Sequence, residues 1–284
     1  MKTFIRIKML PYDTLFLISE HANFIPVNKI LYKHKLDNYI YRLKKKYSLE
    51  YYEKKIKIDC KFICLDLSDC HKVTDTSVLE NVRNLNLSYC KNIRDVSALG
   101  NVEILDLSYC QYIKDLSMLR NVKVLNLSYC QNITDLSMLG NVEELNLSCC
   151  QNITDVSALG NVKKIDLSHC QNINDVSTLR DVKQLILYGC QNIRDVSMLG
   201  NVKMLNLSCC HNITDVSSLG NVEILDLSGC ERVTDVSALG YVKKLNLSQC
   251  QHITDVSMLG NVEDLVLYGF HNITGLSALR NVRM

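Results

Sequence analysis

Apolar residues recur with a fixed period of 20 positions through most of the chain. In the stretch 141–160, the apolar positions are Val142, Leu145, Leu147, Cys150, Ile153, Val156 and Leu159. The following blocks of 20 repeat this set, and a cysteine occupies every twentieth position from Cys70 to Cys250. A period of this length predicts a stack of small units, each of which buries its apolar side chains against its neighbours.

Each unit contains a Leu-x-Leu pair, or Ile165-x-Leu167 in one unit, which predicts a short strand, and eleven such pairs between residues 65 and 267 predict a parallel sheet. The stretch 155–159 predicts a tight turn or one turn of helix. The side chain of Asp155 or Ser157 can bond the free backbone amides there. Gly160 suits a turn exit that needs a positive φ, but Arg or Glu fills this position in other units, so that conformation is not obligatory.

The first 58 residues precede the period and differ in composition. They hold both prolines and half of the 14 tyrosines, and residues 1–60 carry 13 Lys and Arg against 6 Asp and Glu. The spacing of Ile40, Leu43, Tyr47 and Tyr51 predicts an amphipathic helix within residues 38–56. We therefore expect a small helical N-terminal domain over residues 1–58. A repeat array of about eleven 20-residue units follows over residues 59–284.

The repeat resembles a known family. The pattern Leu125-x-Leu127-x-x-Cys130-x-x-Ile133-Thr134-Asp135 resembles the leucine-rich repeat of the cysteine-containing class. This resemblance implies an α/β solenoid with a parallel β-sheet on its concave face and a protein-binding role. The units are shorter than is usual for the class, so we expect short turns or 3-10 helices on the convex face instead of full helices.

The N-terminal region adds a second, narrower resemblance. Cysteine-class repeats commonly occur in F-box proteins, and Leu10, Pro11, Leu15 and Ile18 resemble the opening of a degenerate F-box, whose residues contact a ubiquitin-ligase adaptor. The later Val-Cys-x-x-Trp signature is absent, and the chain contains no tryptophan. The resemblance implies the substrate-recognition subunit of a ubiquitin ligase. The alternatives are a stand-alone scaffold with a structural N-terminal cap, and a nucleic-acid-associated protein that uses the basic N-terminal region.

Cofactors, metals and catalytic residues are not expected. The stacked cysteines predict buried, reduced thiols in the cytoplasm or nucleus. The sequence contains no apolar run long enough to span a membrane, no phosphate-binding glycine loop, and no Ser/His/Asp arrangement apart from the repeat. Residue usage and near-identical units resemble repeat proteins of protists or of large DNA viruses, which for a viral protein implies the host-cell cytoplasm.

The candidate partner surface lies where the repeat changes. Most Leu-x-Leu pairs enclose Asn or Asp and are followed by Ser, which predicts a monotonous polar concave face. Two units replace these polar residues with an aliphatic residue and a tyrosine, a composition typical of binding hot spots. We predict that a protein partner contacts Ile186, Tyr188, Met204, Ile224, Val266 and Tyr268. The alternative is sequence drift in a duplicated array.

Overall fold

The computed structural model describes residues 4–9, 13–18, 40–43, 63–80, 82–270, 272–280 and 282–283, and up to residue 64 it does so through the backbone alone. The chain divides into two compact units. Unit 1 is Met1–Leu127 and unit 2 is Ser128–Met284. Each unit is described by itself.

Unit 1 is a sheet of antiparallel and parallel strands with 3-10 turns between the parallel ones. Its strands are β1 (Phe4–Met9), β2 (Asp13–Ile18), β3 (Ile40–Leu43), β4 (Ile63–Asp66), β5 (Asn84–Asn86), β6 (Ile104–Asp106) and β7 (Val124–Asn126). Strands β1 to β3 pair antiparallel, and β3 to β7 pair parallel in chain order. The 3-10 turns are η2 (Ser77–Leu79), η3 (Ser97–Leu99) and η4 (Ser117–Asn121).

The prediction of a helical N-terminal domain over residues 1–58 is wrong for the described part of this region, which forms strands. Strand β3 lies inside the predicted helix and pairs in parallel with β4. Its sequence contains Ile40 and Tyr41, residue types that favour strands, and pairing with a neighbouring strand overrides a helical spacing counted over few turns. The rest of the predicted helix and the expected domain boundary near residue 58 lie outside the described residues.

Unit 2 repeats one coil through seven parallel strands. These are β8 (Glu144–Asn146), β9 (Lys164–Asp166), β10 (Gln184–Ile186), β11 (Met204–Asn206), β12 (Ile224–Asp226), β13 (Lys244–Asn246) and β14 (Asp264–Val266). Each strand pairs with the next at a shift of 20 residues. The 3-10 turns are η5 (Ser157–Leu159), η6 (Ser177–Asp181), η7 (Ser197–Asn201), η8 (Ser217–Asn221), η9 (Ser237–Leu239), η10 (Ser257–Leu259) and η11 (Leu276–Leu279).

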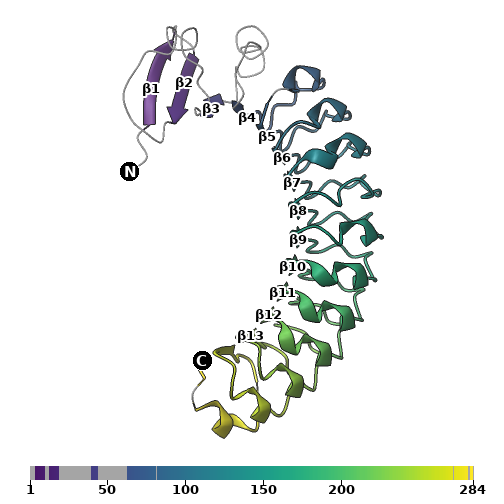
Figure 1. Cartoon of the computed structure of the whole chain (residues 1–284), viewed down its shortest axis with the longest axis vertical. Coiled ribbons are helices and arrows are strands. Elements are labelled where there is room, and N and C mark those ends of the chain that lie inside the picture. Colours follow the sequence, from purple (N-terminus) through teal and green to yellow (C-terminus); the bar gives the residue numbers. More distant parts are fainter. Residues whose placement is uncertain are drawn as a thin grey trace. The chain divides into compact units, whose positions relative to one another are not determined.

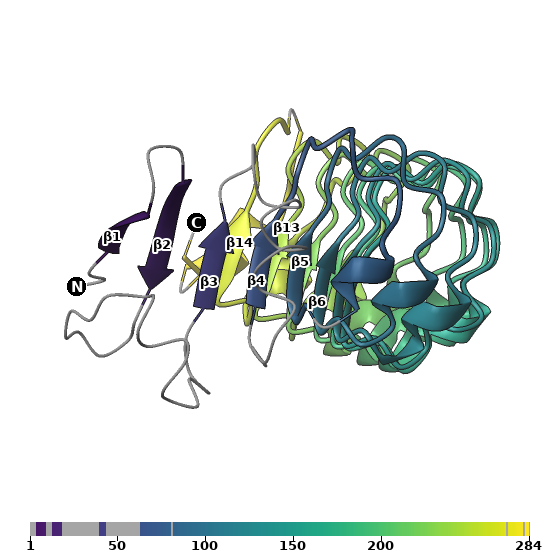
Figure 2. The ribbon, with the colours of Figure 1, turned by 90° about the horizontal axis from the view of Figure 1, so that it is seen from above.

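Strands and 3-10 turns occupy opposite sides of the coils, as expected. Within unit 2 the strands line the inner side of the curve and the turns line the outer side (Figure 1). In unit 1, strands β4, β5 and β6 likewise stand on the side away from the turns (Figure 2). We call the outward-facing residues of the strands the strand face.

The core of each coil consists of the seven predicted apolar positions. In the coil 141–160 all seven have an exposed fraction of 3% or less, and Leu147, Cys150 and Leu159 have none. Burial of one such aliphatic side chain contributes about 2 kcal/mol. Because the partners of each side chain lie in the adjacent coils, the 20-residue period fixes the core of the whole stack.

Hydrogen bonds of side chains to the backbone close the turns. The carboxylate of Asp155 accepts a hydrogen bond from the backbone N–H of Ser157 at 2.8 Å, so of the two capping candidates Asp155 is the acceptor. Gly160 has a negative φ of −59°, contrary to the suggestion of a positive one. The absence of a side chain at Gly160 instead allows close packing, because a Cβ there would lie 2.8 Å from the carbonyl oxygen of Thr178. The positive φ falls at the residue before the repeated cysteine, such as Cys149 at 61°.

Candidate functional site

Four of the predicted partner-binding residues lie on three successive coils of the strand face of unit 2. Met204 on β11 and Ile224 on β12 are direct partners in the parallel register. Ile186 lies on β10, two residues beyond Gln184, which is the partner of Met204. Neighbouring strands are about 4.8 Å apart, so Met204 and Ile224 are side by side, and Ile186 lies diagonally from Met204 at about 7–8 Å. Together with Tyr188, we call them the apolar patch.

The patch faces solvent, and its tyrosine is held in place. Tyr188 and Met204 are 38% and 40% exposed, while Ile186 and Ile224 are half-buried. The imidazole of His169 meets the Tyr188 ring edge-on, with 4.7 Å between ring centroids and 79° between planes. A ring fixed before binding loses less conformational entropy when a partner arrives.

Val266 and Tyr268 are exposed but lie apart from the patch. They belong to the β14 coil, where they are 50% and 70% exposed. Strands β11, β12 and β13 carry Asn206, Asp226 and Asn246 at the position that Ile186 occupies on β10. Four strand steps of about 4.8 Å put roughly 19 Å between the two pairs, so Val266 and Tyr268 are separate from the apolar patch.

Sequence reasoning missed an apolar pair in unit 1, in which Ile104 is exposed and Val124 is half-buried. Ile104 on β6 is 43% exposed and is the direct register partner of Val124 on β7. Both residues occupy the repeat position of Met204 and Ile224. In the same unit the rings of Tyr89 and Tyr109 stack at 4.2 Å and 11°. A comparison of the first strand position across all units could have found the aliphatic pair.

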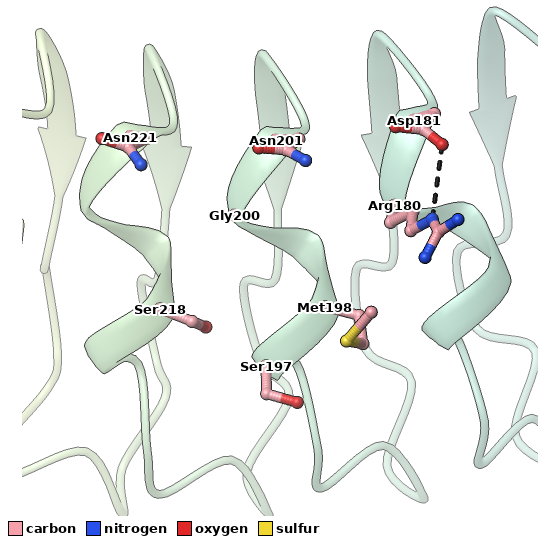
Figure 3. A pocket seen from close by; sticks show the side chains of 8 residues that line it. All are labelled: Arg180, Asp181, Ser197, Met198, Gly200, Asn201, Ser218 and Asn221. Atoms are coloured by element: carbon pink, nitrogen blue, oxygen red, sulfur yellow. Dashed lines mark hydrogen bonds and ion pairs between the residues drawn. The ribbon is translucent and has the colours of Figure 1, made fainter.

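The turn side of unit 2 carries an open groove of about 440 Å³. Its lining residues are Arg180, Asp181, Ser197, Met198, Gly200, Asn201, Ser218 and Asn221. Figure 3 shows Asn201 and Asn221 in equivalent places on neighbouring coils, and Arg180 paired with Asp181 at 3.4 Å. The groove is polar, and none of the predicted site residues lines it.

Other sequence-based candidates have less structural support. Of the four residues assigned to a ligase adaptor, Leu15 and Ile18 lie in strand β2, while Leu10 and Pro11 lie outside the described residues. Within the described ranges, no group of three or more His, Cys, Asp or Glu residues lies close enough together to hold a metal ion. The same part of the chain contains no helix that is long and apolar enough to cross a membrane.

The cysteine ladder consists of free thiols. Cys150, Cys210 and their equivalents between Cys90 and Cys250 are buried and unpaired by disulfides, whereas Cys149 and Cys209 are half-buried. Burial raises the pKa of the Cys150 and Cys210 thiols to about 12. The ladder thiols are therefore protonated at neutral pH and are poor nucleophiles and poor metal ligands.

Comparisons with known proteins agree with this architecture. Residues 119–139 and 141–160 match the family model described as Leucine Rich repeat. An internalin (inlF) from Listeria monocytogenes is similar over 80% of this chain and 86% of that one, with 20% identity and a TM-score of 0.58. The search of curated proteins finds no match. The matched residues are therefore leucine-rich repeats, and the surrounding coils repeat the same pattern and share the fold of that solved structure.

Two further solved structures are similar at lower scores. The functional domain of InlJ from Listeria monocytogenes, described as including a cysteine ladder, has 18% identity and a TM-score of 0.46, over 78% of this chain and 56% of that one. A leucine-rich-repeat protein from Leptospira interrogans has 17% identity and a TM-score of 0.43, over 79% of this chain and 77% of that one.

Proposed function

We propose that this leucine-rich-repeat protein is a binding scaffold, and that a protein partner docks on the strand face with the apolar patch as its main contact. The observation that carries the proposal is the cluster of Ile186, Tyr188, Met204 and Ile224 at positions where most other coils present polar or charged residues. Tyrosine is enriched among interface hot spots, and a group of exposed apolar side chains marks an interaction site. The proposed role is binding, and no reaction is assigned to it.

The coil of β10 lacks a turn hydrogen bond that the neighbouring coils of β11 and β12 form. In β11 the side-chain oxygen of Asn206 accepts a 2.8 Å hydrogen bond from the backbone N–H of Ser208, and Asp226 does the same for Ser228 in β12. Ile186 has no side-chain oxygen, so its coil lacks this turn closure. A change that removes a stabilising hydrogen bond and exposes apolar area fits a residue retained for binding.

A variant that restores the common polar residues tests the proposal. Ile186→Asn with Tyr188→Ser gives the β10 coil the pair found in β11, so the fold is retained. Tagged wild type and variant would be used to capture proteins from the cells that make the protein, with bound proteins quantified by mass spectrometry. We expect the variant to capture at least about tenfold less of the partner, because hot-spot truncations cost about 2 kcal/mol or more of binding free energy.

The matched control removes an exposed apolar side chain from the other side of the coils. Met198→Ala, in η7, leaves the strand face intact and should capture the partner as the wild type does. Equal capture by wild type, control and the double variant would contradict the proposal.

The ubiquitin-ligase role is a narrower proposal that no described residue favours. It predicts that the ligase adaptor co-precipitates with the wild type and is lost on changing Leu10, Pro11 and Leu15 to Ala. Because β2 is a strand within the N-terminal region that was expected to be helical, we favour the scaffold without a ligase link. The basic N-terminal region that would serve nucleic-acid binding lies largely outside the described residues. We also propose a reducing compartment such as the cytoplasm or nucleus, because free cysteines are common there.

A further inference from the structure

A row of charged residues borders the strand face of unit 2, one residue before the start of each strand, and ends at Arg283 in the coil that follows the last strand. In chain order the row is Glu143, Lys163, Lys183, Lys203, Glu223, Lys243, Glu263 and Arg283. The signs alternate along this charge row with a single departure at Lys183. A glutamate at that place would make the alternation complete.

Because the signs alternate, neighbouring residues of the row form ion pairs with one another. The Lys163 ammonium lies 2.8 Å from the Glu143 carboxylate, and Glu223 is contacted by Lys243 at 3.3 Å and Lys203 at 3.8 Å. Opposite charges on neighbouring strands stabilise a sheet, and like charges destabilise it.

Unit 1 shows the same arrangement at the same repeat position. Glu103 lies between Arg83 and Lys123, and the Lys123 ammonium is 2.6 Å from its carboxylate. Hydrogen bonds from these two cations lower the pKa of Glu103 to about 2. A complete basic–acidic–basic triplet is therefore the ordinary state of this repeat position.

Lys183 has like charges on both sides. Its backbone N–H donates to the carbonyl of Lys163 at 3.0 Å, and its carbonyl accepts from Met204 in the coil of Lys203, also at 3.0 Å. Among the described residues Lys183 forms no ion pair. The nearest carboxylate on β9, Asp166, is engaged by the backbone N–H and hydroxyl of Ser168.

The uncompensated lysine adjoins the apolar patch. Lys183 precedes Gln184, the register partner of Met204, and the same strand continues to Ile186. Apolar side chains and an ammonium without a counter-ion thus lie next to one another on the strand face. An acidic partner complements both features, because its carboxylate would supply the negative charge that the row lacks.

We propose that the segment bound at the apolar patch is an acidic, apolar peptide of the partner protein, with an Asp or Glu carboxylate paired to Lys183. This inference rests on the proposed function and names the chemistry of the partner. Ionic attraction at the edge of an interface mainly accelerates association and selects the partner, and it weakens as salt screens the charges.

Peptide selection provides the probe. A phage-displayed library of random peptides is selected against the full-length wild type, and the enriched peptides are synthesised with their acidic residues intact, changed to amides, or changed to lysine. Binding is measured by fluorescence anisotropy at low and high salt. We expect aliphatic peptides with Asp or Glu to be enriched. Changing their acids to lysine should weaken binding about tenfold, since both attraction is lost and repulsion is gained.

Variants at position 183 separate binding from folding. Lys183→Gln should lower the affinity for the acidic peptides about threefold, and Lys183→Glu should lower it about tenfold or more. Lys183→Glu completes the alternation, so it should raise the melting temperature by about 1–3 °C while it lowers affinity. The matched control Lys123→Glu breaks the triplet of unit 1. It should lower the melting temperature by a similar amount and leave peptide affinity unchanged.

The outcomes distinguish this inference from the proposed function. If Ile186→Asn with Tyr188→Ser abolishes binding but Lys183→Glu does not, the scaffold stands and the acidic partner is wrong. Enrichment of basic or uncharged peptides, or of none, also overturns the inference. If partner capture is insensitive to Ile186 and Tyr188, the proposed function fails whatever the charge of the peptides.

Discussion

The thiol of Cys210 donates a hydrogen bond to the backbone carbonyl of Leu187 in the preceding coil, with 3.0 Å between sulfur and oxygen. The same carbonyl lies 3.1 Å from the backbone N–H of Cys190, which closes its own turn. Equivalent thiol bonds are formed by Cys90, Cys110, Cys170, Cys190, Cys230 and Cys250. The repeated cysteine thus acts both as a small apolar side chain and as a weak donor that joins successive coils.

Removing one thiol from the ladder should weaken the stack. Cys210→Ala deletes the bond to Leu187 and leaves a small void among fully buried side chains. We expect a loss of about 1–2 kcal/mol in the free energy of unfolding, measured by urea denaturation. Cys209→Ala, on the adjacent half-buried residue, is the control and should change stability by less than about 0.5 kcal/mol. Equal effects at the two positions would argue against a special role for the ladder thiols.

The two cysteine doublets should react differently within each pair. Cys149 and Cys209 are half-buried, whereas their neighbours Cys150 and Cys210 are buried and have pKa values raised to about 12. Only a thiolate alkylates rapidly. Iodoacetamide on the native protein should therefore label the first cysteine of each doublet, and peptide mass spectrometry should find the second unlabelled until denaturant is added. Labelling of Cys210 at the rate of Cys209 in the native state would contradict the buried ladder.

Glu103 should make the stability of unit 1 depend on pH at the acidic end. Its folded-state pKa of about 2 lies below the ordinary value of 4.5, because Arg83 and Lys123 bond its ionised form. A depressed carboxyl pKa stabilises the fold above about pH 4.5, and the contribution is lost as the pH falls towards 2.

The variant Glu103→Gln isolates this contribution. For a partly exposed network we expect it to cost about 0.5–1 kcal/mol at pH 7, and we expect the difference from wild type to shrink as the pH falls towards about 2. Urea denaturation across this range measures the difference. A gap between the two proteins that stays constant with pH would show that the carboxylate charge is not the cause.

The coil core could be predicted from the sequence because the period determines it. Every apolar position of the coil 141–160 is buried as expected, since each side chain meets its counterpart 20 residues away. The left-handed position could not be predicted in the same way. It is filled by Asp69, Tyr89, His169, Gln249 or glycine in different coils, and such varied residue types give no common signal.

The N-terminal region and part of the site were predicted less well for related reasons. Outside the period, the helix prediction relied on a few apolar residues, and β3 gains its partner from a strand distant in sequence. On the strand face, Ile186 and Val266 could be predicted because they replace the polar residue between the two leucines. Ile104 and Val124 were not predicted, because Asp106 and Asn126 keep the usual polar residue at that position in their coils.

Glycine should be the favoured residue at the left-handed position in two coils. Gly189 has a φ of +69°, and a Cβ there would lie 2.7 Å from the imidazole Nδ1 of His169. Gly189→Ala should cost about 1–2 kcal/mol, since it adds both backbone strain and this clash. Cys149→Gly removes similar strain at a φ of 61°. It should stabilise by no more than about 1 kcal/mol, because glycine also gives the unfolded chain more freedom.

The combination with His169→Gly separates the two costs of Gly189→Ala. Without the imidazole the clash disappears but the positive φ remains, so the double variant should recover only part of the loss, measured relative to His169→Gly alone by urea denaturation. Full recovery would mean that the left-handed backbone carries no strain at this position. No recovery would mean that His169 moves aside freely. In that case the Tyr188 ring, which meets the same imidazole edge-on, is not held in place by it.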